Sequence, residues 1–214
     1  MTPRYGILAA LVLGLSVRLA PWSRVFAGGQ AAFVDTDDYY HLRRMMVAAA
    51  NFPALPAFDR YLGHPEGFFV NWPPLYDWVG GLFLRILVGA TPDLYRSQII
   101  LAWIAPLCGL LTLWLFYRAV RPLLGPRPAL TALFIAAVMP MQVFYTLLGR
   151  PDHHSVENLW FLLAVPLSLR LVRAEDPGLS RKLASWTGAL LAAGTLCWIG
   201  DVMFSLSLFI FLAG

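Results

Sequence analysis

Long apolar runs separated by short polar stretches make up most of this chain. Such runs lie near residues 5–25, 98–117, 129–148, 155–171, 183–198 and 202–214. A helix that crosses a membrane needs about 20 mostly apolar residues. We therefore interpret the runs as membrane spans, the last of them being short for a full crossing. The sequence predicts an all-α membrane protein in which several transmembrane helices form a bundle.

The stretch between the first two runs, residues 26–97, has a different character. It is rich in proline, glycine and aromatic residues, and it holds seven of the twelve acidic residues of the chain. We interpret it as a long loop or a small subdomain outside the membrane. Its apolar segment, Trp78–Val88, is too short to span and contains Arg85, which favours a helix lying at the membrane surface.

The first apolar run has an alternative interpretation. A basic start, an apolar stretch and the small residues Ala27, Gly28 and Gly29 follow one another, as in a cleavable secretory signal. Arg18 and Arg24 fall where such a signal would be apolar or small. We therefore prefer an uncleaved first span.

The basic residues predict how the spans are oriented. Residues 118–127 contain three arginines and no acid, and residues 170–182 contain three arginines and one lysine. Short loops rich in Arg and Lys stay in the cytoplasm. The long stretch 26–97 and the turn 149–154 must then face the outside of the cell membrane.

Composition supports the membrane interpretation and excludes a soluble secreted domain. The chain is 59% hydrophobic and 13% charged, whereas soluble domains average about 25% charged residues. The net charge of +4 does not indicate nucleic-acid binding, because the basic residues flank the apolar runs. We expect contact with membrane lipid and no nucleic-acid partner. Cys108 and Cys197 lie within apolar runs and are expected to serve packing.

Two acidic motifs fall in the segments predicted to lie outside. The first is Asp35–Arg44, with three aspartates and a histidine, and the second is Gly149–Glu157, which contains Asp152, His153 and His154. Carboxylates this close repel one another unless a cation or hydrogen bonds stabilise them. Oxygen ligands with an imidazole suit Mg²⁺ or Mn²⁺, and Mn²⁺ tolerates the nitrogen better. The motifs therefore predict a shared metal site.

Helix capping is the alternative for each aspartate. Asp37 or Asp38 could cap a helix that begins at Tyr39, and Asp152 could cap the helix predicted over residues 155–171. A single motif does not separate capping from metal binding. Two such motifs on one side of the membrane favour a site.

Three further residues are candidates for supporting roles. Glu157 lies one helical turn from His154, so it is either a partner that orients a metal ligand or an acid at a helix N-terminus. Arg150 is either a phosphate ligand or a head-group anchor. His41 follows the aspartates by one turn, and its alternative is hydrogen bonding at the interface.

Both motifs resemble those of a known family. Asp37–Arg43 resembles the first acidic motif of the catalytic subunit of oligosaccharyltransferase, a GT-C membrane glycosyltransferase, with the family aspartate at Asp37. Gly149–His154 resembles the second motif in its archaeal form, Gly-X-X-Asp-His-His, with metal ligands at Asp152 and His154. Asn71–Leu75 and the Trp198-X-Gly200 segment also look like the family, and the resemblance covers most of the chain.

The resemblance implies a function. The enzyme would transfer an oligosaccharide from a polyprenyl phosphate or pyrophosphate lipid to an asparagine of an acceptor polypeptide. Asp37 and Asp152 would be catalytic, and Mn²⁺ or Mg²⁺ would bind Asp37, Asp152 and His154. The family continues with further spans, another acidic ligand and an acceptor-binding domain with a Trp-Trp-Asp motif. Because these are not found in the 214 residues, we expect the chain to be inactive alone.

Two other functions remain open. Another GT-C enzyme would share the outer acid and use a different acceptor, although the Asp-His-His turn favours the oligosaccharyltransferase. A transporter or assembly subunit with a cation site would not catalyse transfer. Transporters place their charged groups near the middle of the membrane, whereas both motifs here are predicted at its outer edge.

Overall fold

The computed structural model describes residues 3–213 and is mostly helical. In chain order its elements are α1 (Pro3–Arg18), α2 (Trp22–Val25), α3 (Thr36–Asn51), β1 (Phe58–Asp59), β2 (Phe68–Phe69), α4 (Leu75–Leu87), α5 (Leu94–Ala102), α6 (Ile104–Leu124), α7 (Pro126–Val138), α8 (Pro140–Phe144), α9 (His154–Val172), α10 (Pro177–Cys197) and α11 (Asp201–Ala213). The two strands pair antiparallel, Phe58 opposite Phe69.

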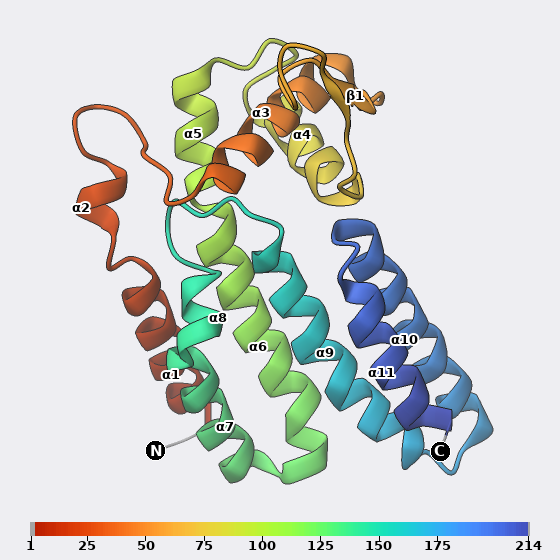
Figure 1. Cartoon of the computed structure of the whole chain (residues 1–214). Helices are drawn as coiled ribbons and strands as arrows, with labels where there is room; N and C mark the ends of the chain where they lie inside the picture. Colours follow the sequence, from red (N-terminus) through yellow and green to blue (C-terminus); the bar gives the residue numbers. More distant parts are fainter. Residues whose placement is uncertain (1–2, 214) are drawn as a thin grey trace.

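The helices form two layers. Helices α1, α6, α7, α9, α10 and α11 lie alongside one another in the lower layer, and α3, α4 and the strand pair form an upper layer across one end (Figure 1). The upper layer falls within residues 26–97. Of the two interpretations of this stretch, the structure supports a small folded subdomain, and the apolar segment 78–88 belongs to α4 except for its last residue.

Two helical stretches are long and apolar enough to cross a membrane, judged by length and composition. They are Leu94–Leu124, which comprises α5 and α6, and His154–Val172, which is α9. Pro126–Val138 and Asp201–Leu212 are apolar but shorter. The described residues thus form a mostly helical fold with two candidate membrane spans. The six predicted crossings and their orientation remain predictions.

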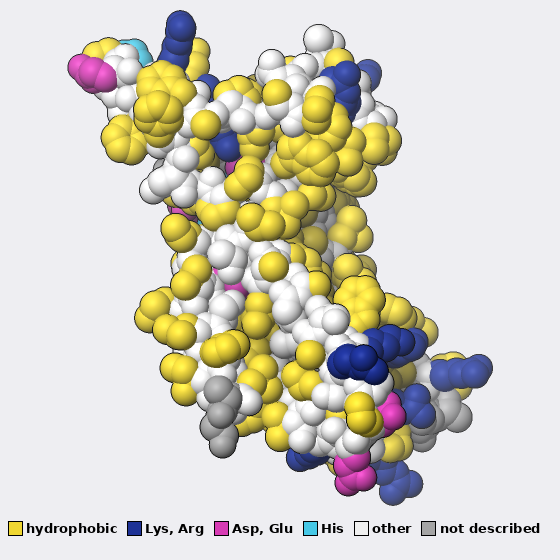
Figure 2. Space-filling model, turned by 90° about the vertical axis from the view of Figure 1, so that its right-hand side faces the viewer, with side chains coloured by type: hydrophobic (Ala, Val, Ile, Leu, Met, Phe, Trp, Pro, Cys, Tyr) yellow, Lys and Arg dark blue, Asp and Glu magenta, His cyan; other side chains and the backbone are white. Residues whose placement is uncertain are grey.

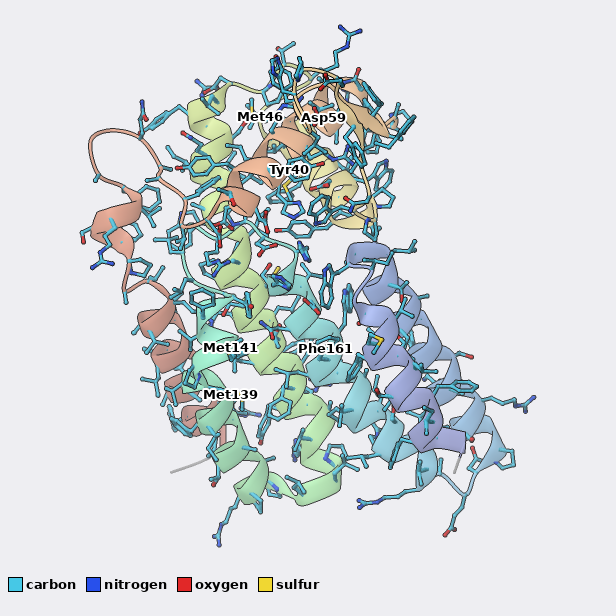
Figure 3. The ribbon with its side chains drawn as sticks, in the orientation of Figure 1. Tyr40, Met46, Asp59, Met139, Met141 and Phe161 are labelled. Atoms are coloured by element: carbon cyan, nitrogen blue, oxygen red, sulfur yellow. The ribbon has the colours of Figure 1, made fainter. Side chains whose placement is uncertain are left out.

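The apolar runs 5–25 and 129–148 are not continuous helices, in contrast to the sequence prediction. The second run breaks at Met139 (ψ 122°), between α7 and α8, and Figure 3 labels Met139 and Met141 at this break. Pro140 causes the break, because proline disfavours helical geometry in the residue before it and has no N–H to donate. The first run is likewise divided between α1 and α2, with Pro21 preceding α2.

Glycines let α3 and α4 approach closely. A Cβ on Gly81 would lie 2.3 Å from the Ala48 Cβ, and one on Gly80 would lie 2.4 Å from the Met45 sulfur. Real Cβ atoms do not make contacts this short, so larger residues would force the helices apart. The pair of glycines therefore sets the spacing of the upper layer.

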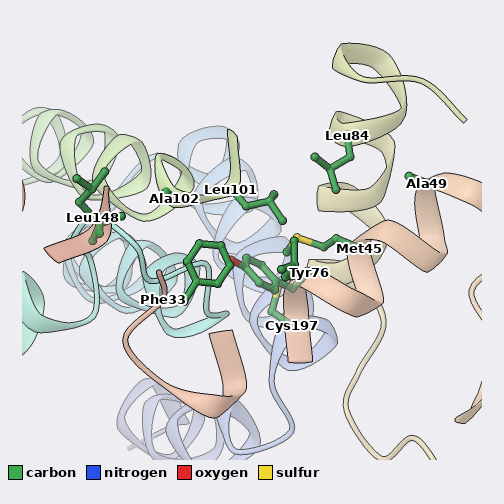
Figure 4. Packing of buried hydrophobic residues seen from close by; sticks show 11 residues of the cluster. Phe33, Met45, Ala49, Tyr76, Leu84, Leu101, Ala102, Leu148 and Cys197 are labelled. Carbon is green, nitrogen blue, oxygen red and sulfur yellow. The ribbon is translucent and has the colours of Figure 1, made fainter. Parts of the chain in front are cut away.

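A buried apolar cluster joins the two layers. It is shown in Figure 4 and contains Val25, Phe33, Leu42, Met45, Ala49, Tyr76, Leu84, Leu101, Ala102, Leu148 and Cys197. Its members come from α2, α3, α4, α5 and α10, and from the segments that precede α3 and follow α8. Because the cluster is shared, the upper layer is packed onto the helices beneath it.

Arg18, at the end of α1, is fully buried in the lower layer. It donates hydrogen bonds to Thr146 Oγ1 at 2.8 Å, to Gly14 O at 2.6 Å and to Ala137 O at 3.2 Å, and it also contacts Gln142. No carboxylate pairs with it among residues 3–213. Through its guanidinium, Arg18 thus binds the end of α7 and the segment that connects α7 to the second acidic motif.

Candidate functional site

The first acidic motif lies at the start of α3, where the backbone uses two of its three carboxylates. Asp35 accepts a hydrogen bond from Thr36 N at 2.7 Å, and Asp38 Oδ2 accepts one from Asp35 N at 2.8 Å. The two form a capping box, which satisfies N–H groups at the helix start. The predicted cap at Asp37 or Asp38 of a helix beginning at Tyr39 is therefore wrong, because the helix begins at Thr36 with Asp35 as its cap.

Asp37 is the carboxylate that the cap leaves free. Its side chain is exposed, and it makes no hydrogen bond or ion pair with any residue that the structure describes. Asp38 beside it is fully buried. The capping geometry thus separates two adjacent aspartates into a structural one, Asp38, and an accessible one, Asp37.

The second acidic motif is a tight turn before α9. Gly149 has φ 81°, which favours glycine, and a Cβ there would lie 2.7 Å from Val25 Cγ2. Gly149 N donates to Ala102 O at 3.1 Å, and Val34 N donates to Gly149 O at 3.3 Å. The last bond joins the backbone just before the first motif to the backbone of the second. The two motifs, far apart in sequence, are therefore neighbours.

Asp152 does not cap α9 with its side chain. The N-cap residue is His153, which forms no side-chain cap, and Ser155 Oγ donates to the main-chain oxygen of Asp152 at 2.9 Å. The alternative role of Asp152 as a helix cap is thus wrong. Its carboxylate is buried and points to charged side chains instead.

Arg150 lies between the carboxylates of both motifs. Its guanidinium is 3.8 Å from Asp35, 4.0 Å from Asp38 and 3.6 Å from Asp152, measured between the nearest nitrogen and oxygen atoms. The side chain is buried beneath the ring of Phe144, at 4.2 Å from its centroid. Arg150 Nε and Nη1 have no hydrogen-bond partner among the described residues. The arginine therefore lies between the two motifs and has two buried donor atoms without a hydrogen bond within the described part of the chain.

A buried chain of side chains connects α4 to the second motif. His41 Nδ1 is 2.6 Å from Asp77 Oδ1, His41 Nε2 is 2.9 Å from His153 Nδ1, and His153 Nδ1 is 2.7 Å from Asp152 Oδ1. All four residues are at most 2% exposed. Arg44 adds a 3.3 Å contact to the other Asp77 oxygen. His41 therefore contacts the second motif directly.

His154 and Glu157 form a second pair at the start of α9. His154 Nδ1 contacts Glu157 Oε2, and His154 Nε2 lies 4.0 Å from Asp152 Oδ2. The side chain of His154 is 25% exposed, whereas that of Glu157 is buried. Glu157 thus orients the imidazole whose other nitrogen faces Asp152.

Burial and neighbouring charges shift the pKa values of the site in opposite directions. Burial, with the charges of Asp152 and Asp35, raises the pKa of Asp38 to about 7. Burial also raises the pKa of Asp152. The hydrogen bond and charge of His153, together with the charges of the other imidazoles, outweigh burial and lower this pKa to about 2. Burial opposes ionisation of His41, yet Asp77 outweighs it and raises the pKa. Asp152 is therefore ionised at neutral pH.

Two groups of side chains bring three potential metal ligands within 4.8 Å of one another. They are His41, Asp152 and His153, and His153, His154 and Glu157. Of the predicted trio Asp37, Asp152 and His154, the structure brings the last two together. Asp37 lies outside both groups, at the exposed first turn of α3.

Sequence reasoning missed Asp77 and gave His153 no role of its own. Asp77 could have been found from helix periodicity: the buried residues of α4 are Tyr76, Asp77, Gly80, Gly81 and Leu84, so the aspartate lies on the apolar face. A carboxylate on such a face needs a partner. Nothing in the sequence identified His41 as that partner.

Comparison with known proteins relates the chain to oligosaccharyltransferases. Residues 7–214 match the family described as "Oligosaccharyl transferase STT3, N-terminal". Dolichyl-phosphooligosaccharide-protein glycotransferase 2 of Archaeoglobus fulgidus is 30% identical over 203 residues, which are 93% of this chain and 31% of that protein. Glycotransferase 1 of the same organism is 28% identical over 199 residues, covering 92% and 31%. The chain thus spans less than a third of these relatives.

Solved structures show the same fold. A crystal structure of the Archaeoglobus fulgidus oligosaccharyltransferase tethered with an acceptor peptide has a TM-score of 0.83 at 23% identity, covering 94% of this chain and 25% of that one. The structure of that enzyme with Zn and sulfate has a TM-score of 0.81 at 25% identity, covering 92% and 25%. With its matching sequence, its fold and its two apposed acidic motifs, the chain belongs to the STT3 oligosaccharyl transferase family, of which it represents the N-terminal part.

Proposed function

We propose that the intact protein transfers an oligosaccharide from a polyprenyl phosphate or pyrophosphate lipid to an asparagine of an acceptor polypeptide. The observation that carries the proposal is the meeting of both acidic motifs around Arg150, between Asp38 and Asp152. The relatives named above are glycotransferases that act from a dolichyl-linked oligosaccharide to protein. Because this chain spans only a part of them, the activity is assigned to the whole protein.

The donor set supports a bound divalent cation. Asp152 is ionised and buried, and His154 Nε2 faces it at 4.0 Å. A related enzyme binds Zn in its solved structure. We assign Mn²⁺ or Mg²⁺ to Asp37, Asp152 and His154, with Glu157 orienting His154. When bound, the cation would neutralise charge on the departing phosphate.

The side chains themselves have separate tasks in this proposal. Asp37, exposed and free of partners, orients the weakly nucleophilic amide nitrogen of the acceptor towards the sugar. Arg150, with unused donors, supplies positive charge beside the phosphate. Asp152 holds its charge at neutral pH because the surrounding imidazoles lower its pKa. Both motifs would then act from the extracytoplasmic side of the cell membrane, as the distribution of basic residues predicts.

The test is oligosaccharide transfer by the intact protein in detergent, with a polyprenyl-linked donor and an asparagine-containing peptide. Asp37→Ala and Asp152→Ala are each expected to abolish transfer, whereas Glu66→Ala, an exposed acid of the same layer, should retain it. Near-normal transfer by either site variant would remove that residue from the proposal. Equal transfer to a peptide with Gln in place of Asn would favour a GT-C enzyme with another acceptor.

A further inference from the structure

The end of the molecule opposite the acidic motifs carries a basic pocket. It has a volume of about 590 Å³ and is lined by Arg118, Arg121 and Pro122 of α6, Pro126 of α7 and Arg170 of α9. Figure 2 shows Lys and Arg side chains gathered at this lower end of the molecule. Residues distant in the sequence thus bring three guanidinium groups to one pocket.

The three arginines are not neutralised by the protein. None of them forms an ion pair or a side-chain hydrogen bond with any residue in the described range 3–213. The nearest acids in sequence to Arg170 are Glu175 and Asp176, and Asp176 is used to cap α10 by accepting from Leu179 N. Like charges held together without a counter-charge repel one another. An anion in the pocket would relieve that repulsion.

The surroundings of the pocket suit an anion attached to an apolar chain. Arg118 stacks on the ring of Trp114, 5.3 Å from its centroid, and Trp114 is 42% exposed. Tryptophan and arginine at helix ends are typical of the boundary between lipid and water. Leu124, which is also exposed, closely follows Pro122 at the end of the same helix. A water-soluble anion would gain nothing from these apolar side chains, whereas a lipid would.

We propose that Arg118, Arg121 and Arg170 form a binding site for the phosphodiester head group of an anionic phospholipid. Basic pockets between membrane helices bind such head groups, because guanidinium groups pair with phosphate oxygens in two-pronged geometry. The site lies at the far ends of α6 and α9 from the acidic motifs, so it is separate from the proposed transfer reaction (Figure 1). It would give this end of the bundle a fixed lipid partner.

The experiment measures binding of phosphatidylglycerol to the intact protein in neutral phosphatidylcholine nanodiscs by native mass spectrometry. The pocket variant combines Arg118→Gln, Arg121→Gln and Arg170→Gln. Its matched control, Arg127→Gln, Arg173→Gln and Arg181→Gln, removes the same charge from the same end without touching the pocket. We expect the pocket variant to bind at least about tenfold more weakly and the control to bind as the wild type does.

Several outcomes would overturn the proposal. Equal weakening in both triple variants would indicate diffuse surface charge, and unchanged binding in the pocket variant would place the lipid elsewhere. Competition by inorganic phosphate at the same concentration would indicate a free anion as the ligand. If the pocket variant does not fold, the single Arg121→Gln variant, whose side chain is exposed, replaces it and must still weaken binding measurably relative to Arg127→Gln.

Discussion

Asp77 on α4 holds His41 on α3 through a buried hydrogen bond, 2.6 Å from His41 Nδ1 to Asp77 Oδ1. The other nitrogen of His41 faces His153, whose ring contacts Asp152. A carboxylate that orients an imidazole beside a metal ligand is a common outer-shell arrangement. Asp77 thus acts on the second motif through His41.

We expect Asp77→Asn to weaken Mn²⁺ binding by the intact protein about 10- to 100-fold, because the amide no longer fixes the orientation and charge of His41. Titration calorimetry measures the effect. Asp59→Asn is the control, since Asp59 is a buried carboxylate of the same layer that pairs with Arg43, away from the second motif. Equal metal affinity in Asp77→Asn and wild type would show that Asp77 serves packing alone.

The capping box predicts that substitution of Asp35 lowers stability, whereas substitution of the nearby Asp37 abolishes activity. Asp35→Ala removes the N-cap of α3 and should lower the free energy of unfolding by about 1 kcal/mol. Asp37→Ala removes an exposed side chain without partners and should change it by less than about 0.5 kcal/mol, while abolishing transfer. Thermal unfolding in detergent, compared with the transfer assay, tests both. A large loss of stability in Asp37→Ala would contradict its assignment as the free carboxylate.

The α3–α4 spacing predicts opposite effects of two Gly→Ala substitutions. Gly81→Ala places a Cβ 2.3 Å from that of Ala48 and should destabilise the protein by about 1–3 kcal/mol. Gly188, within α10, has nothing within 4 Å of the added Cβ, so Gly188→Ala should stabilise by about 0.5–1 kcal/mol. Melting temperatures of the two variants give the comparison. Similar shifts in both would show that the close contact does not set the spacing.

Arg18 predicts a further stability effect. Arg18→Met leaves the Ala137 carbonyl and the Thr146 hydroxyl without their donor in the interior, which should cost about 2–4 kcal/mol. Arg24→Met is the control, because Arg24 belongs to the same apolar run, 5–25, and its side chain is exposed. Thermal unfolding by tryptophan fluorescence measures both. Equal melting temperatures would mean that water or lipid satisfies these groups when the guanidinium is removed.

Periodicity and motif spacing predicted much of this molecule, and their failures have physical causes. The sequence predicted the helix over residues 155–171, because this stretch is apolar. The structure has one continuous helix, His154–Val172, even with Pro166 inside it. The run 129–148 was equally apolar, yet Pro140 ends the helix there. Hydropathy averages over a window and does not register one missing N–H group.

The candidate site was predictable in its members more than in its geometry. Asp152 and His154 were predicted from the second motif, and His154 Nε2 lies 4.0 Å from Asp152 Oδ2. The pairing of His41 with Asp77 was not predictable, because it depends on how α3 crosses α4. Which aspartate of the first motif is free also depended on the position of the helix start, which propensity places only within a few residues.

The bond from Val34 N to Gly149 O has a consequence for synthesis. The ribosome synthesises the first acidic motif before the second. The segment that forms α3 and α4 is therefore made before the second motif, which it contacts in the folded protein. Because the bond involves main-chain atoms, many substitutions at position 34 preserve it. The two motifs can therefore stay apposed even when the side chains around them are substituted.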